Sequence, residues 1–181
     1  MTVLLLLGGV RAGKSTLAVS LARSRGGEVW VLATGEARDE EMATRIRAHR
    51  AARPAEWSVI EEPQELDRAL DAVPSTATVI LDCLTLWVAN LIEARSAAEI
   101  LEQTRRLVTR ARSRDGLTLV VSNEVGLGLV SPNPLGRAYS DLLGRVNALW
   151  SEAADEVLLV VAGRGVRLAP VDVDRWGPAR G

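Results

Sequence analysis

Short apolar runs alternate along this chain with longer stretches in which apolar residues recur at helical spacing. The apolar runs carry few charges and predict buried strands at residues 3–7, 29–33, 78–82, 118–122 and 156–161. The longer stretches predict helices near residues 14–25, 38–52, 64–72, 97–114 and 136–153. This alternation predicts an α/β fold with a mostly parallel sheet and helices on both faces. Ligands then bind beyond the carboxyl ends of the strands.

Three further segments complete this interpretation. Residues 57–60 predict a short strand or an extended connector, and residues 166–168 follow Gly163-Arg164-Gly165 as the return arm of a C-terminal antiparallel hairpin. The last dozen residues are rich in Pro, Gly, Asp and Arg and predict a loosely held tail. No repeat or linker interrupts the chain, so we expect residues 1–181 to form one domain.

The first predicted strand runs directly into a glycine-rich segment, Gly8-Gly9-Val10-Arg11-Ala12-Gly13-Lys14-Ser15. It matches G-x-x-x-x-G-K-[ST] in full and stands between a strand and a helix, which is the context that a phosphate-binding P-loop requires. Glycines let the backbone wrap around an anion, and the loop amides and helix dipole supply partial positive charge. Lys14, the only lysine among 22 basic residues, can reach the β- and γ-phosphates. The predicted nucleotide contacts here are Gly8, Gly9, Val10, Arg11, Ala12, Gly13, Lys14, Ser15 and Thr16.

The alternative to a P-loop is a glycine-rich turn followed by a surface lysine. That interpretation leaves the preceding strand, the spacing of the motif and the solitary lysine unexplained. The sequence therefore favours a protein that binds a nucleoside triphosphate.

An acid ends the third predicted strand, Thr78-Val79-Ile80-Leu81-Asp82. In P-loop proteins an aspartate at this place orients Mg²⁺ or its water shell, so Ser15 and Asp82 are the predicted metal ligands. A strand that merely ends in a polar residue is common, but the upstream P-loop favours the metal site. A guanine-reading Asn/Thr-Lys-x-Asp motif needs a second lysine, which argues against a Ras-type GTPase and leaves GTP open as a substrate.

His49 is the only histidine and falls within the predicted helix 38–52. Met42, Ile46 and His49 share one helical face, so the imidazole can end a stripe of core residues. Arg45, His49 and Arg53 also share a face, and such a cationic cluster suits a polyphosphate. The spacing alone leaves both interpretations open.

Composition limits the partners and the compartment. The net charge of −1 argues against a nucleic-acid partner bound through bulk charge. The lone Cys83 excludes an internal disulfide and fits a reducing compartment. The apolar run near residue 3 is too short for a membrane span and lacks the basic leader of a signal peptide. We therefore expect a cytoplasmic protein with no nucleic-acid partner and no stable membrane insertion.

Several blocks, in order from about residue 3 to 168, carry a more specific signal. Besides the P-loop they are Ala33-Thr34, Asp39-Glu40-Glu41-Met42, Arg45-Ile46-Arg47-Ala48-His49-Arg50, Arg53-Pro54-Ala55-Glu56-Trp57, Glu61, Leu81-Asp82-Cys83-Leu84-Thr85, Ser122-Asn123-Glu124-Val125-Gly126-Leu127-Gly128 and Gly144-Arg145-Val146-Asn147. Together they resemble the bifunctional adenosylcobinamide kinase/adenosylcobinamide-phosphate guanylyltransferase family of cobalamin biosynthesis. In the loop, many members of that family carry Ala and Ser where this chain has Val10 and Ala12, two positions that contribute mainly backbone amides.

The resemblance implies a RecA-like P-loop fold and two successive reactions on a corrinoid. In the first, ATP or GTP phosphorylates the side-chain alcohol of adenosylcobinamide, with Lys14 as a catalytic residue and Mg²⁺ at Ser15 and Asp82. In the second, His49 attacks the α-phosphate of GTP, expels pyrophosphate and carries GMP to the substrate's new phosphate. The resemblance also implies a homotrimer. Its guanine-nucleotide site would contain Thr34, Gly35, Glu36, Arg50, Ala51, Ala52, Arg53, Glu61 and Asp82.

Three questions remain open at this level. A small-molecule P-loop kinase with a structural His49 is one alternative function, and a nucleotide-gated RecA-type assembly module is another. Glu61 can accept hydrogen bonds from guanine N1 and N2, a role suggested by chemistry alone. The segment Asn123-Glu124-Val125-Gly126 is either a corrinoid-binding or closing loop or a simple glycine-rich turn.

Overall fold

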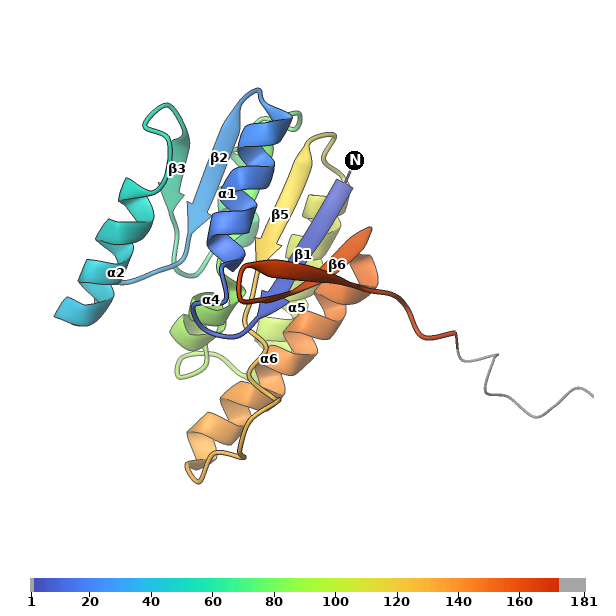
Figure 1. Ribbon diagram of the computed structural model, residues 1–181. Coiled ribbons are helices and arrows are strands. Elements are labelled where there is room, and N and C mark those ends of the chain that lie inside the picture. The colour runs from blue at the N-terminus through green and yellow to red at the C-terminus, as the bar shows by residue number, and fades with distance from the viewer. Residues whose placement is uncertain (1, 173–181) are drawn as a thin grey trace, which may run out of the picture.

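A single seven-stranded sheet forms the centre of the molecule in the computed structural model, which describes residues 2–172 (Figure 1). The strand order is β3-β2-β4-β5-β1-β6-β7, with the first six strands parallel and β7 antiparallel to β6. The mostly parallel sheet and the terminal hairpin are therefore confirmed. The predicted tail lies, from residue 173 onward, outside the described residues. The strands are β1 (Thr2–Gly8), β2 (Val29–Ala33), β3 (Ser58–Glu61), β4 (Thr78–Asp82), β5 (Leu117–Val121), β6 (Glu156–Val161) and β7 (Arg164–Leu168).

Six helices connect these strands, and five of them match predicted segments. The sequence interpretation missed α4, which follows β4 after one residue and has few polar positions to reveal a helical period. Its buried side chains nevertheless fall at Leu84, Trp87, Val88 and Leu91, one face of a helix. The helices are α1 (Lys14–Arg25), α2 (Glu40–Ala51), α3 (Leu66–Asp71), α4 (Leu84–Leu91), α5 (Ala97–Arg112) and α6 (Pro134–Ala153).

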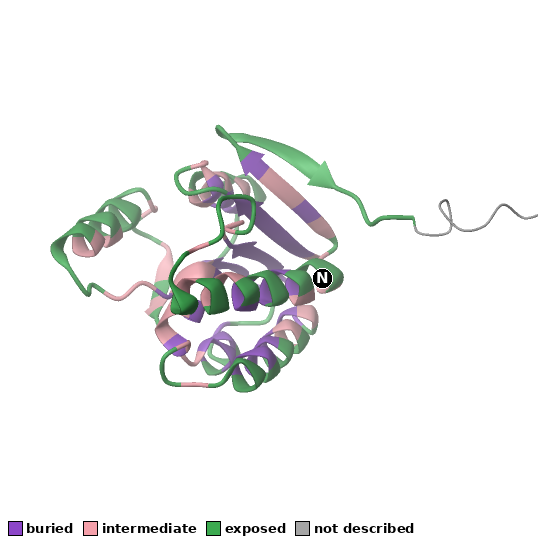
Figure 2. Ribbon diagram, turned by 90° about the horizontal axis from the view of Figure 1, so that it is seen from below, coloured by how far each residue is buried: buried purple, intermediate pink, exposed green. Residues whose placement is uncertain are grey.

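The two faces of the sheet are covered unequally. Helices α3, α4, α5 and α6 pack against one face, where Trp87 and Trp150 supply the largest buried side chains in a chain without Phe. On the other face α1 packs through Ala18 and Ala22. Helix α2 buries none of its residues and stands away from the body of the molecule, as its exposure in Figure 2 shows. Packing therefore fixes α1 firmly against the sheet, whereas α2 lacks such support.

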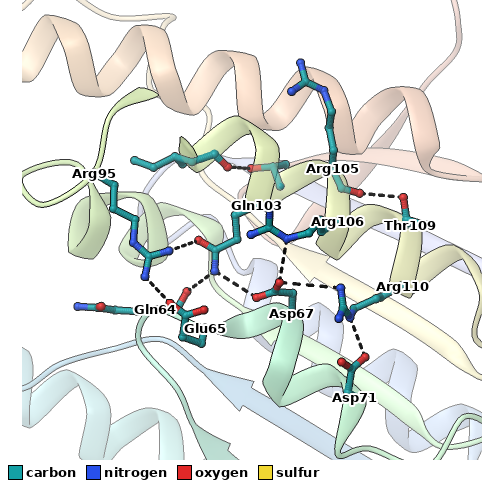
Figure 3. Close-up of polar contacts among 12 residues, drawn as sticks. Gln64, Glu65, Asp67, Asp71, Arg95, Gln103, Arg105, Arg106, Thr109 and Arg110 are labelled. Atoms are coloured by element: carbon teal, nitrogen blue, oxygen red, sulfur yellow. Dashed lines mark hydrogen bonds and ion pairs between the residues drawn. The ribbon is translucent and has the colours of Figure 1, made fainter. Parts of the chain in front are cut away.

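A buried polar network joins α3 to α5 (Figure 3). The carboxylate of Asp67 accepts hydrogen bonds from Gln103 at 3.2 Å and Arg106 at 3.3 Å, and Arg110 lies 3.9 Å away. Burial alone would raise the pKa of Asp67, but these bonds and the arginine charge hold the pKa below its ordinary value. The carboxylate therefore stays ionised and paired, which keeps the cost of burying it low.

No helix among residues 2–172 is both long enough and apolar enough to cross a membrane.

Two glycine-to-alanine substitutions test the packing, because we expect one to lower and the other to raise the free energy of unfolding. A Cβ at Gly116 would lie 2.1 Å from the carbonyl oxygen of Ala77, so the backbone must shift, and we expect Gly116→Ala to lose about 1–3 kcal/mol. Gly144 is exposed on α6 with nothing within 4 Å of an added Cβ. We expect Gly144→Ala to gain up to about 1 kcal/mol, because alanine is the better helix former. Urea unfolding measures both, and changes of the same sign would contradict this description.

Candidate functional site

The P-loop continues from the end of β1, and the two glycines that its motif specifies, Gly8 and Gly13, make close backbone contacts. Gly8 has φ 148°, and a Cβ there would lie 2.2 Å from the carbonyl oxygen of Val160. Gly13 has φ 100°, and its Cβ would lie 3.2 Å from Gly163 in the turn of the β6–β7 hairpin. That turn supports the loop directly, since the Gly163 amide donates to the Ala12 carbonyl at 2.8 Å. Glycine is therefore required at both positions.

Lys14, the first residue of α1, folds back over the loop. Its Nζ donates to the carbonyl oxygens of Gly8 at 2.9 Å and Gly9 at 2.7 Å. Burial lowers the pKa of Lys14, and the nearby acidic groups of Cys83 and Asp82 oppose that effect. The ammonium group therefore lies at the loop, where a bound phosphate chain would meet it.

The carboxylate of Asp82, at the end of β4, lies at the centre of the site. Ser15 Oγ donates to its Oδ1 at 3.1 Å, and Arg53 Nη2 donates to its Oδ2 at 2.8 Å. His49 Nδ1 lies 3.5 Å from the same Oδ2. Burial alone would raise the pKa of Asp82, but His49, Arg53 and Ser15 together hold the pKa below its ordinary value. A charged carboxylate thus connects the P-loop helix to the end of α2.

Helix α2 presents His49 to this carboxylate without burying it. Asp39 caps the helix by accepting from the Met42 amide at 2.7 Å. The side chain of His49 is 47% exposed, and no residue of α2 is buried, so the imidazole does not end a core stripe. Met42 and Ile46 instead line a cavity beside His49. Arg45 and Arg53, the cationic residues that share the other helical face with His49, line the same cavity. Both helical faces seen in the sequence therefore border the same space.

This cavity has a volume of about 540 Å³ and lies between the P-loop, α2 and the carboxyl ends of β2 to β5. Its size is that of a site for one small-molecule ligand. Ser15 and Asp82 place two oxygen atoms 3.1 Å apart within it, next to Lys14. Among residues 2–172 no cluster of three or more His, Cys, Asp or Glu side chains is placed to hold a metal ion on its own.

Most of the predicted site residues meet at this cavity. Those that line it are Val10, Arg11, Ala12, Gly13, Lys14, Ser15, Thr16, Gly35, His49, Arg50, Arg53, Glu61 and Asp82. Those that do not line it are Gly8, Gly9, Thr34, Glu36, Ala51 and Ala52. Nucleotide contact remains a prediction for all of them.

Thr34, one of the predicted nucleotide contacts, holds the backbone next to Asp82. It is fully buried, and its hydroxyl donates to the Cys83 carbonyl at 2.8 Å and accepts from the Cys83 amide at 2.9 Å. The Thr34 amide also donates to the Asp82 carbonyl at 3.1 Å. Thr34 therefore holds the turn that carries Asp82. Glu36, which also lies away from the cavity, pairs with Arg38 at 2.8 Å.

The cavity wall also contains residues that the sequence interpretation did not assign to the nucleotide site. Asn123 follows β5, and its backbone is held by the Thr85 hydroxyl at 2.8 Å and by Asn147 at 3.0 Å. Cys83, Thr85 and Leu86 belong to the start of α4, the helix that the hydrophobic pattern did not reveal. Because Asn123 comes directly after a strand on the ligand side, the sequence interpretation leaves it open between a corrinoid-binding or closing loop and a simple glycine-rich turn.

Comparison with known sequences decides the family. Residues 4–168 match the sequence model of the cobinamide kinase / cobinamide phosphate guanyltransferase family. The chain belongs to this family. The bifunctional adenosylcobalamin biosynthesis protein CobP of Pseudomonas aeruginosa is 39% identical over 88% of this chain and 92% of its own length. The corresponding protein CobU of Escherichia coli is 35% identical over 92% of this chain and 99% of its own length. The cobinamide kinase / guanyltransferase family is thus one of enzymes with two activities.

Solved structures of low sequence identity confirm the P-loop, RecA-like fold. RadB recombinase aligns with a TM-score of 0.51 at 17% identity, over 87% of this chain and 73% of its own. A protein from Pyrococcus horikoshii aligns with a TM-score of 0.57 at 8% identity, over 96% of this chain and 88% of its own. At such identities the likeness concerns the fold alone. The assembly-module alternative depended only on that fold, and membership of an enzyme family argues against it.

The chain's lone thiol offers a test of the cavity wall. Burial raises the pKa of Cys83 to about 11, and the charge of Asp82 adds to this effect. At pH 8 the thiolate fraction is then on the order of a hundredfold smaller in the native protein than in the unfolded chain. Only the thiolate reacts with an alkylating agent. We expect iodoacetamide to label native protein correspondingly more slowly than urea-unfolded protein. The native rate should rise with pH up to about 11, as mass spectrometry would follow. Equal rates in the two states would contradict this environment.

Proposed function

We propose that both reactions of the family take place at the cavity between the P-loop and α2. The nucleotide substrates are ATP or GTP for the phosphoryl transfer and GTP for the guanylyl transfer. The observation that carries this proposal is the shared carboxylate of Asp82, which contacts Ser15 at 3.1 Å and lies 3.5 Å from His49 Nδ1. A nucleotide whose phosphates occupy the P-loop is thereby within reach of the imidazole.

The phosphoryl transfer depends on residues of the loop. The loop amides and Lys14 stabilise the charge on the transferring γ-phosphoryl group, while the corrinoid alcohol attacks in line with the leaving oxygen. Ser15 and Asp82 offer the oxygen ligands that Mg²⁺ prefers, and a site with only two protein oxygens suits a metal that also binds substrate phosphates. Mg²⁺, when bound there, neutralises charge on the β- and γ-phosphates.

In the guanylyl transfer, His49 acts as the nucleophile. Asp82 faces Nδ1 and favours a proton there, so Nε2 keeps the lone pair that attacks the α-phosphorus of GTP. The new N–P bond replaces the bond to pyrophosphate, which leaves. A phosphate oxygen of adenosylcobinamide phosphate then attacks the same phosphorus and releases the imidazole, giving adenosylcobinamide-GDP. Arg45 lines the cavity without an ion pair among the described residues, so it is available to the departing pyrophosphate.

Recognition of guanine is assigned to Glu61, at the carboxyl end of β3. Its carboxylate forms an ion pair with Arg50 and borders the cavity. A carboxylate can accept from both N1 and N2 of guanine, and the ion pair with Arg50 would hold the side chain in place for that purpose. This assignment explains how the chain selects GTP without a second lysine.

Two variants test the two reactions, one at the proposed nucleophile and one at the P-loop lysine. Wild type incubated with [α-³²P]GTP should carry label that is labile to acid and stable to alkali, the behaviour of a phosphoramidate. His49→Ala should take up no label and still phosphorylate adenosylcobinamide. Lys14→Ala should lose the phosphoryl transfer by at least about a hundredfold, because one charged donor to a transition state is worth about 3 kcal/mol. Arg47→Ala is the matched control, since Arg47 lies on α2, pairs with Glu40 and is absent from the cavity wall.

Two outcomes would refute parts of this proposal. Unlabelled wild type would remove the guanylyl intermediate and leave a kinase with a structural His49. A fully active Lys14→Ala enzyme would remove the P-loop from the phosphoryl transfer.

The assembly and location of the enzyme stay expectations. We expect a homotrimer in the cytoplasm that binds a corrinoid and no nucleic acid. Light scattering on a size-exclusion column would give the mass, and a monomer at working concentrations would contradict the trimer.

A further inference from the structure

The segment between β5 and α6 exposes large apolar side chains close to the candidate site. Leu127 is 83% exposed, Leu129 is 102% exposed and Val130 is 80% exposed. Residues 125–130 carry no charge, and we call them the apolar loop. Large apolar side chains gathered at full exposure mark a binding surface more often than a structural need.

The apolar loop is anchored at the P-loop. The Glu124 amide donates to the Gly8 carbonyl at 3.2 Å, and this same oxygen accepts from Lys14 Nζ. Val125 packs against the core, so the exposed residues begin directly after a fixed point. Asn123, one residue before that point, lines the cavity. The exposed side chains therefore continue the wall of the candidate site outward from the lysine.

The other end of the loop is held by the start of α6. Asn133 caps this helix by accepting from the Leu135 amide at 2.9 Å, and Arg137 donates to the carbonyls of Ser131 and Pro132. Residues 134–141 include no buried residue, whereas the later turns pack on the sheet. The loop and the first turns of α6 extend past the carboxyl edge of the sheet (Figure 1). Tyr139 ties these turns to the core, while Leu135 and the apolar side chains of the loop stay exposed.

The geometry of the reaction indicates what lies against the apolar loop. A cavity of about 540 Å³ holds one nucleotide-sized ligand and cannot also enclose a corrin macrocycle, so the ring must lie outside it. The attacking and leaving oxygens of a phosphoryl transfer lie roughly in line, so acceptor and donor approach from opposite sides. Helix α2 borders the donor's cavity, and the apolar loop begins beside Lys14, where the Glu124 amide and Lys14 Nζ share the Gly8 carbonyl. An acceptor that lies on the loop would therefore approach the lysine from outside the cavity. The conjugated skeleton of a corrin ring, with the methyl groups that stand between its amide side chains, is apolar and matches this surface better than it matches the arginines.

We propose that the apolar loop, together with Leu135 on α6, binds an apolar face of the corrinoid ring and directs its side-chain alcohol toward Lys14. Leu135 is 46% exposed and extends the same surface. This inference rests on the proposed function, because it assigns the acceptor's place at that site. A second copy of this chain is the competing occupant, which the experiment distinguishes.

The test uses the double variant Leu127→Ser/Leu129→Ser and the matched control Val166→Ser/Val171→Ser. The control residues are 58% and 76% exposed and lie on β7 and beyond it. We expect the loop variant to raise the KM for adenosylcobinamide by about tenfold or more, because each leucine loses apolar contact with the ring. The KM for ATP and the labelling by [α-³²P]GTP should not change, and the control should behave as wild type.

Equilibrium dialysis with cobinamide, followed by its visible absorbance, measures binding without turnover. A weakened affinity of the loop variant supports the inference even if wild type proves unable to phosphorylate the corrinoid, an outcome that would refute only the proposed function. An unchanged affinity and KM would overturn the inference. A loop variant that falls to a smaller assembly by light scattering would assign the surface to contacts between copies and would likewise overturn it.

Discussion

The site depends on one carboxylate shared by three partners. Asp82 accepts from Ser15 through one oxygen and from Arg53 through the other, with His49 3.5 Å away. The side chains of Asp82 and Arg53 are 10% and 9% exposed, so this is a nearly buried ion pair. Such a pair offers little net stability, since desolvation offsets the attraction, but removal of either partner leaves an unpaired buried charge. The contact therefore fixes geometry more than it stabilises the fold.

That geometry matters because α2 has no other firm support. None of its residues is buried, and Met42 and Ile46 only line the cavity. Its charged contacts are those of His49 with Asp82 and of Arg50 with Glu61, and Arg53, two residues beyond its end, also reaches Asp82. Apolar packing is non-directional, whereas hydrogen-bonded charges constrain both distance and angle. The position of the imidazole relative to the P-loop is consequently set by electrostatics on a scaffold fixed by packing elsewhere.

The sequence predicted the parts of the molecule that follow local rules. The strand, loop and helix around Lys14 were predicted at residues 3–7 and 14–25, because hydrophobic period and motif agree there. Helix α4 was missed because a helix with few polar positions leaves no period to detect. The contact between Ser15 and Asp82 was predicted from P-loop logic. The approach of Arg53 to Asp82 was not, since it depends on a turn after α2 and on the adjacency of β2 and β4. The hydrogen bonds between Thr34 and Cys83 were not predicted for the same reason, because the two residues lie 49 positions apart in the sequence.

The resting position of Lys14 has a physical consequence for phosphate binding. Its ammonium bonds the carbonyls of Gly8 and Gly9 and must leave them to reach a phosphate chain. A buried carbonyl that loses its only partner costs about 1–3 kcal/mol, a penalty that would oppose nucleotide binding. Each of these carbonyls has a second donor, however: the Glu124 amide at 3.2 Å for Gly8 and the Ala12 amide at 3.3 Å for Gly9. Lys14 can therefore bind a phosphate instead, and each carbonyl oxygen keeps one hydrogen-bond donor. The Glu124 amide directly precedes the apolar loop. The Gly8 carbonyl therefore both holds the start of that loop and accepts the hydrogen bond that Lys14 must give up to bind phosphate.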